Sequence, residues 1–184
     1  PWLHSVIRNA DIMLILVDLS QDPVGQLGTT IQELQNLRIT IAGLESGETM
    51  GAIYPKKTLI VGNKTDLDPS GYAFEALRAR YGSLSPVLAI SALKRVGLFE
   101  MGKAIFMALD IVRVYTKVPG QKAELTRPFV LKKGSTVADV AAAVHKDIVA
   151  KLKYAELWGS GRFQGQRVKR DYVLQDGDVV ELHA

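Results

Sequence analysis

The chain has 184 residues, 47% of them hydrophobic, which is enough for one large or two small packed domains. It contains no cysteine, which excludes a disulfide framework and a cysteine-bound metal or iron–sulfur site and suits a reducing compartment. The net charge of +4 is uneven, because residues 1–112 carry 10 basic and 11 acidic side chains and the remainder carry 13 and 8. The basic C-terminal part suggests an anionic partner such as RNA, and a merely solvated basic surface explains the charge equally well.

The longest apolar run, Ile12–Val17, is far too short to span a bilayer, and no signal peptide is visible. We therefore expect a cytoplasmic protein with no membrane partner. The first residue is Pro1 rather than methionine, so we expect that the chain is a piece of a longer protein.

The first part of the chain alternates strand and helix patterns. Short apolar runs bounded by polar residues predict buried strands at Ile12–Leu19, Thr58–Gly62 and Val87–Ile90. Helical patterns cover Gly28–Leu44, Tyr72–Tyr81 and Gly97–Leu109, and a loop is expected between Leu44 and Lys56. This order predicts an α/β domain with a parallel sheet over residues 1–110.

After Asp110 the pattern changes to that of a small α+β domain, residues 111–184. Thr136 and Asp139 form a capping box that begins an apolar helical stripe running from Val137 to Leu152. Alternating or short apolar runs predict strands at Ile111–Thr116, Pro128–Leu131, Ala155–Trp158, Gln166–Val168 and Val179–Leu182.

The second predicted strand ends in Asn63-Lys64-Thr65-Asp66, at the sheet edge where open α/β sheets bind ligands. The N1–H and N2–H₂ groups of guanine present two donors, and the Asp66 carboxylate can accept both. Adenine lacks that pair, and mispairing a buried polar group costs roughly 1–3 kcal/mol. The Lys64 stem can lie flat on the base, and the Asn63 amide can bond its edge. The motif therefore predicts guanine recognition.

The third predicted strand ends in Ile90-Ser91-Ala92-Leu93, again at a carboxyl end. In Ras-like GTPases two such loops lie side by side. The resemblance implies that the Ala92 N–H meets guanine O6 and that Ser91 braces the Asp66 loop. Leu93 is the third residue of this loop, where many GTPases have a lysine that covers the base.

Residues 97–104, GLFEMGKA, come close to the phosphate-loop pattern G-x-x-x-x-G-K-[ST] but end in alanine. A phosphate loop follows a strand directly, whereas this segment follows the Ser91 loop and carries the helix-packing residues Leu98, Phe99 and Met101. We expect Gly97 to begin a helix and Lys103 to be a surface lysine. No other G-x-x-x-x-G-K occurs in the 184 residues, so no catalytic residue is assigned.

With these motifs, essentially the whole chain resembles the Obg-like GTPases, in particular the developmentally regulated GTP-binding (DRG) branch. The C-terminal part resembles their TGS domain, named for threonyl-tRNA synthetase, GTPase and SpoT. That resemblance rests on RVYTKVPGQ (113–121), RPFVLKKGSTVADVA (127–141), HKDI (145–148), KYAELWG (153–159) and DYVLQDGDVVELH (171–183).

The resemblance implies the C-terminal half of a P-loop GTPase domain followed by a β-grasp TGS domain. It implies GTP or GDP as ligand, with Mg²⁺ and in some members K⁺ in the full-length protein, and a cytosolic role with the ribosome or RNA in translation. The guanine-binding positions that carry over are Asn63, Lys64, Asp66, Ser91 and Ala92. Phosphate-loop and switch residues have no counterpart, so we expect no hydrolysis by this chain alone.

Seven basic residues of the second domain are candidates for RNA contact, because cations bind phosphates and exposed aromatic rings stack on bases. Tyr154, Trp158, Phe163 and Tyr172 are interleaved with them. The alternative is that Trp158 and Phe163 pack inside the domain while the cations are solvated. The seven are Lys146, Lys151, Lys153, Arg162, Arg167, Lys169 and Arg170.

The histidines and the first strand give weaker indications of function. His4, His145 and His183 lack metal-ligand spacing, so no metal site is predicted, and Asp18 at the end of the first strand is expected to tie down a neighbouring loop. In a Ras-like sheet the strand Ile12–Leu19 would pair with a strand preceding Pro1. We therefore expect its apolar edge to contact another chain, or to be covered by a helix or the TGS domain.

Two other classes of function compete with a GTP-binding protein. One is a non-enzymatic RNA- or ribosome-binding adaptor that carries a vestigial GTPase remnant, and sequence upstream of Pro1 would discriminate between the two. The other, an NAD or flavin enzyme, lacks the G-x-G-x-x-G loop that such a sheet needs.

Overall fold

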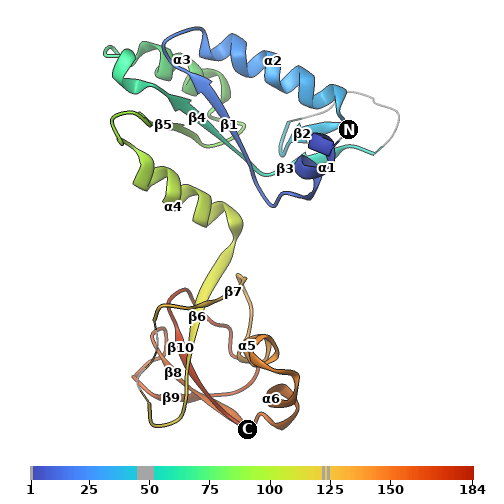
Figure 1. Ribbon diagram of the computed structural model, residues 1–184, viewed down its shortest axis with the longest axis vertical. Helices are drawn as coiled ribbons and strands as arrows, with labels where there is room; N and C mark the ends of the chain where they lie inside the picture. The colour runs from blue at the N-terminus through green and yellow to red at the C-terminus, as the bar shows by residue number, and fades with distance from the viewer. Residues whose placement is uncertain (1, 45–51, 122, 124) are drawn as a thin grey trace. The chain divides into compact units, whose positions relative to one another are not determined.

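The computed structural model describes residues 2–44, 52–121, 123 and 125–184 (Figure 1). The chain divides into two compact units between Leu109 and Asp110, and the proposed domains divide one residue later. Among the described residues no helix is both long and apolar enough to cross a membrane.

The first unit contains a three-stranded parallel sheet in the order β1-β4-β5, and a short parallel ladder of β2 with β3. Figure 1 shows α2 and α3 running along this sheet. The elements of the unit are α1 (Trp2–Asn9), β1 (Met13–Asp18), α2 (Pro23–Asn36), β2 (Ile39–Ile41), β3 (Tyr54–Lys56), β4 (Thr58–Asn63), the 3₁₀ turn Thr65–Leu67, α3 (Tyr72–Tyr81), β5 (Val87–Ala89) and α4 (Leu98–Leu109).

The core of this unit lies between the sheet and helices α2 and α3. Ile15 and Val17 of β1 pack with Leu27 and Leu34 of α2 and with Leu77 of α3. The central strand β4 is buried through most of its length, as a strand covered on both faces should be. The predicted α/β class with a parallel sheet is therefore confirmed.

The helix predicted over Gly28–Leu44 is wrong at both ends. Helix α2 begins at Pro23, because the Asp22 carboxylate accepts the Gly25 N–H at 3.0 Å and proline fits the first helical turn. It ends at Asn36, and the buried residues Ile39–Ile41 form strand β2. The loop expected between Leu44 and Lys56 contains β3, and its residues 45–51 lie outside the described residues.

Strand β1 is an edge strand with one open side. The N–H groups of Met13 and Leu19 donate to carbonyls beside and within β4, at 2.8 and 2.9 Å. By alternation, the backbone groups of Leu14, Leu16 and Asp18 point to the other side, and β1 pairs with β4 alone among the described residues. The side chains of Leu14 and Leu16 are 37% and 58% exposed on one face of the strand, so no described helix of this unit covers them. Contact of this strand with another chain or with the TGS domain stays a prediction.

The second unit is a five-stranded mixed sheet in the order β7-β6-β10-β8-β9, in which only β6 and β10 are parallel. A helix packed across such a sheet, with a central parallel pair, is the β-grasp arrangement. Its elements are β6 (Ile111–Lys117), β7 (Phe129–Lys132), α5 (Val137–Val144), α6 (Lys146–Lys151), β8 (Tyr154–Trp158), β9 (Gln166–Val168) and β10 (Val179–His183).

Helix α5 supplies the core of the second unit. Val137, Val140 and Ala141 are fully buried against inward-facing valine, alanine and leucine residues of the sheet. The predicted capping box is confirmed, since the Thr136 N–H and hydroxyl both donate to Asp139 Oδ2, at 2.7 and 2.8 Å. The predicted continuous helical stripe is broken at His145, whose extended backbone (φ −168°) separates α5 from α6.

The GLFEMGKA segment forms the start of helix α4, and Lys103 is exposed. Gly97 precedes the helix with φ +73°, a left-handed conformation that favours glycine. A Cβ at this position would lie 2.4 Å from the carbonyl oxygen of Ala89, in the strand that leads to the Ser91 loop. Gly97 thus allows α4 to begin directly beside that loop.

Gly97→Ala is expected to lower the free energy of unfolding by more than about 1 kcal/mol, because left-handed backbone strain and the clash with Ala89 add together. Gly102→Ala is the matched control, since Gly102 lies inside α4 with no atom within 4 Å of an added Cβ. That change should stabilise the chain by about 0.5–1 kcal/mol. Urea unfolding of both variants measures the difference, and equal stabilities would contradict the assigned strain at Gly97.

Candidate functional site

The loop after β4 turns sharply at Lys64. Lys64 has φ +69° and ψ 40°, a left-handed conformation that is costly for a residue with a side chain and that concentrates at functional sites. Its N–H donates to Asn63 Oδ1 at 2.8 Å, which holds the turn from inside. The turn leads into the 3₁₀ segment Thr65–Leu67 and brings Asp66 back towards the next strand.

The loop after β5 is bonded to the loop after β4. The hydroxyl of Ser91, which is 1% exposed, donates to Asp66 Oδ1 at 2.5 Å. The N–H of Ala92 donates to Asn63 Oδ1 at 3.0 Å, and that of Thr65 donates to the Ile90 carbonyl at 3.1 Å. The structure therefore places the residues that the sequence singled out next to each other.

Several groups at this junction face outward. Asp66 is half-buried, and no described residue bonds its second carboxylate oxygen, Oδ2. Leu93, which follows Ala92, is 80% exposed. The junction thus offers a braced carboxylate, a backbone N–H that is shared with Asn63, and an uncovered apolar side chain.

Asp18 ends β1 and lies in register with Asn63. Its Oδ2 is 2.5 Å from the Lys64 ammonium nitrogen, and its Oδ1 accepts from the N–H and hydroxyl of Ser20 at 2.9 and 2.6 Å. The hydrogen bond from Lys64 and then those from Ser20 lower the pKa of Asp18 from 3.8 to about 2. Both carboxylate oxygens are already used, so Asp18 ties down the Lys64 loop rather than presenting a carboxylate to a metal.

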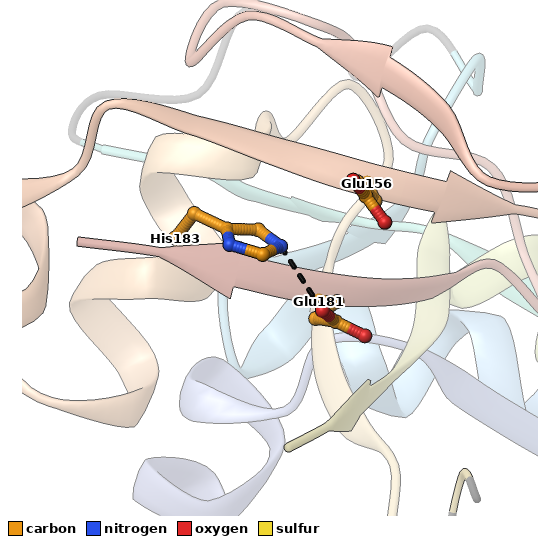
Figure 2. Close-up of side chains that lie close together, drawn as sticks. All are labelled: Glu156, Glu181 and His183. Carbon is orange, nitrogen blue, oxygen red and sulfur yellow. Dashed lines mark ion pairs between the residues drawn. The ribbon is translucent and has the colours of Figure 1, made fainter. Parts of the chain in front are cut away.

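The sheet of the second unit carries a charged cluster on the face opposite α5 (Figure 2). Glu156 on β8 and Glu181 on β10 are directly opposite one another, and His183 follows on the same face of β10. Their potential ligand atoms lie within 4.8 Å of one another, a spacing that could hold a metal ion. The Lys117 ammonium lies 2.6 Å from Glu181 Oε2, however, and would repel a cation there. The sequence did not predict this cluster, because it depends on the pairing of β8 with β10.

The seven basic candidates are all exposed, and they come from two stretches of the chain. Some belong to α6 or the residue that precedes β8, and the others to β9 and its flanking loops. Arg167 lies 3.7 Å from the centroid of the Tyr154 ring, which in turn stacks on His183 at 4.5 Å.

The interleaved aromatic residues have different environments. Phe163 is 64% exposed, whereas Tyr172 packs against the core of the second unit. Trp158 is half-buried beneath the Lys117 ammonium, 3.8 Å from its ring centroid. The alternative that Trp158 and Phe163 both pack inside is therefore wrong for Phe163.

Comparison with known proteins relates the chain to GTP-binding proteins and identifies the domain formed by its second unit. The family model of the TGS domain matches residues 112–184. An uncharacterized GTP-binding protein of Methanocaldococcus jannaschii is 32% identical over 68% of this chain and 32% of its own length. Developmentally-regulated GTP-binding protein 1 of Xenopus laevis is 38% identical over 50% of this chain and 26% of its own. The chain is a homologue of the DRG and Obg-like GTP-binding proteins and carries a TGS domain.

The fold agrees with this identification. A GTP-binding protein of Pyrococcus horikoshii superposes with a TM-score of 0.69 at 18% identity, covering 97% of this chain and 80% of that protein. The YchF GTPase of Schizosaccharomyces pombe gives 0.70 at 11% identity, covering 97% and 74%. The predicted class, a P-loop GTPase sheet followed by a β-grasp domain, is confirmed. The chain spans about a third of the length of the curated relatives it matches.

The ion pair of Asp18 with Lys64 is expected to show in the titration of the Asp18 carboxyl. Because the folded-state pKa lies below the unfolded value of 3.8, the pair's contribution to stability is complete above pH 3.8 and is lost as the pH falls through about 2. Carboxyl-carbon NMR should give a midpoint near 2, and Lys64→Met should move it back towards 3.8. A midpoint near 3.8 in the unmodified chain would contradict the pairing.

Proposed function

We propose that this chain recognises guanine nucleotides through the loops that follow β4 and β5, as part of a GTP-binding protein that works in translation. One observation carries the proposal. Asn63 and Asp66 on one loop are bonded directly to Ala92 and Ser91 on the other, at the carboxyl edge of a parallel sheet. The relatives whose names say that they bind GTP support the same ligand.

The donors and acceptors at this junction fit the edge of guanine. Asp66 Oδ2 is open, and Oδ1 keeps a lone pair beside the Ser91 hydroxyl, so the carboxylate can accept N1–H and N2–H₂ together. Guanine O6 would compete with Asn63 Oδ1 for the Ala92 N–H. Lys64 and Leu93 supply aliphatic surface for the faces of the base.

The proposed site lacks the residues that bind phosphates and metal ions in GTPases. The 184 residues contain no phosphate loop ending in serine or threonine, the hydroxyl that would bind Mg²⁺. The carboxylate beside the site, Asp18, is engaged by Lys64 and Ser20. These residues do not fit Mg²⁺ or K⁺, so the proposal covers recognition of the base, and we expect no hydrolysis by this chain alone.

Titration with fluorescent GDP, with labelled ADP as control, tests base recognition. GDP should bind about 5- to 150-fold more tightly than ADP, because a mispaired buried group costs roughly 1–3 kcal/mol. Asp66→Asn replaces an acceptor by a donor, so this variant should lose GDP and gain xanthosine diphosphate, whose C2 carries a carbonyl. Asp11→Asn, at an exposed position, should change neither affinity. Equal binding of GDP and ADP, or binding of neither, would refute the proposal.

We also propose that the TGS domain contacts RNA, on the ribosome or elsewhere, through its exposed cations. Two triple variants test six of the seven candidates: Lys146, Lys151 and Lys153 changed to Gln, or Arg162, Lys169 and Arg170 changed to Gln. Arg167, which lies over the Tyr154 ring, is left unchanged. Each phosphate contact contributes about 0.7–0.9 to the slope of log affinity against log salt. One triple should therefore lower the slope for a ribosomal RNA probe by about 2–3, and an unchanged slope in both would exclude this surface.

A further inference from the structure

Asp18 is fixed from two sides, although it lies at the open edge of β1. Its N–H donates to Gln26 Oε1 at 2.9 Å, and its carbonyl accepts from Gln26 Nε2 at 3.2 Å. The Gln26 amide thus takes the place that a neighbouring strand would have at this point. Because Gln26 belongs to α2, the position of the Asp18 backbone is set by that helix as well as by the sheet.

The Asp18 carboxylate in turn sets the direction of the Lys64 side chain. In the strand order β1-β4-β5, Asp18 lies on one side of the Lys64 loop and Ser91 and Ala92 lie on the other. The ammonium of Lys64 is bonded to Asp18 Oδ2 at 2.5 Å, so the lysine stem is drawn across the end of β4 towards β1. The Lys64 side chain is about half exposed, and the ion pair with Asp18 is the contact that the structure gives its ammonium.

This direction matters because Lys64 has a second carboxylate close by in sequence. Asp66 follows two residues later, in the same 3₁₀ turn, and one of its oxygens has no bond from a described residue. An ammonium released from Asp18 would be attracted to that free carboxylate oxygen, which is the acceptor needed for guanine. Asp18 thereby keeps a competing cation away from the acceptor.

We propose that Asp18 is a positioning residue for guanine recognition that acts through Lys64. It holds the Lys64 ammonium at the end of β1, which keeps that cation away from Asp66 and leaves the Asp66 carboxylate free to accept from the base. Gln26 and Ser20 hold Asp18 itself in place. This inference rests on the proposed guanine-binding function.

A double-mutant cycle on GDP affinity tests the inference. Asp18→Asn keeps a side-chain oxygen for Ser20 but removes the charge that holds Lys64, and it should weaken GDP binding about two- to fivefold, the factor that an exposed ion pair supplies. In a Lys64→Met background the same change should have no further effect. Asp11→Asn removes one negative charge from an exposed position of the same unit and should leave GDP affinity unchanged.

The outcomes separate the inference from the function on which it rests. If the unmodified chain does not prefer GDP to ADP, the proposed function fails and the role of Asp18 fails with it. If it does prefer GDP and Asp18→Asn binds GDP as Asp11→Asn does, only the inference is overturned. An equal loss in the presence and absence of Lys64 would show a merely structural effect of Asp18 and would also overturn it. Thermal melting curves of all variants identify a temperature at which every variant is folded, and the titrations are done at that temperature.

Discussion

One amide oxygen joins the two loops that follow β4 and β5. Asn63 Oδ1 accepts the N–H of Lys64, which closes the left-handed turn, and the N–H of Ala92, which brings in the neighbouring loop. Together with the bonds from Thr65 N–H to the Ile90 carbonyl and from the Ser91 hydroxyl to Asp66, this acceptor joins the two loops. The parallel sheet supplies the frame, because the carboxyl ends of β1, β4 and β5 meet at the same edge.

The sequence predicted strand β4 and helix α3, but it gave the wrong boundaries for α2. The physical reasons differ. Strand β4 and helix α3 follow strong local patterns, and α3 has the bounds predicted for it. The start of α2 depends on the Asp22 cap, which lies before the apolar helical pattern on which the prediction rests. Ile39–Ile41 is too short to reveal a strand, because its burial depends on pairing with β3. The pair of Asp18 with Lys64 joins residues far apart in the chain and depends on strand register, which a linear pattern does not contain.

The second unit shows a similar limit. Its strands and its capping box follow from alternation and local spacing, and the TGS resemblance was sufficient to name the fold. The row formed by Lys117, Glu181 and Glu156 could not be predicted, since it arises from pairing of β10 with both β6 and β8. That row also shows why net charge is a weak guide to an RNA surface. Lys117 counts towards the basic excess, yet it is mostly buried and neutralises a glutamate.

The two hydrogen bonds between the Gln26 amide and the Asp18 backbone divide the edge of β1 into a paired part and an unpaired part. At Asp18 the edge is closed, so an extended peptide cannot add there and disturb the loops that follow β4 and β5. At Leu14 and Leu16 the edge stays open and apolar, which makes it a template for self-association of the purified chain at high concentration. A substitution on the exposed part of β1 can therefore change self-association without changing the loops at the end of the sheet. Leu16→Lys would protect the exposed length of the strand without reaching the loops that follow β4 and β5.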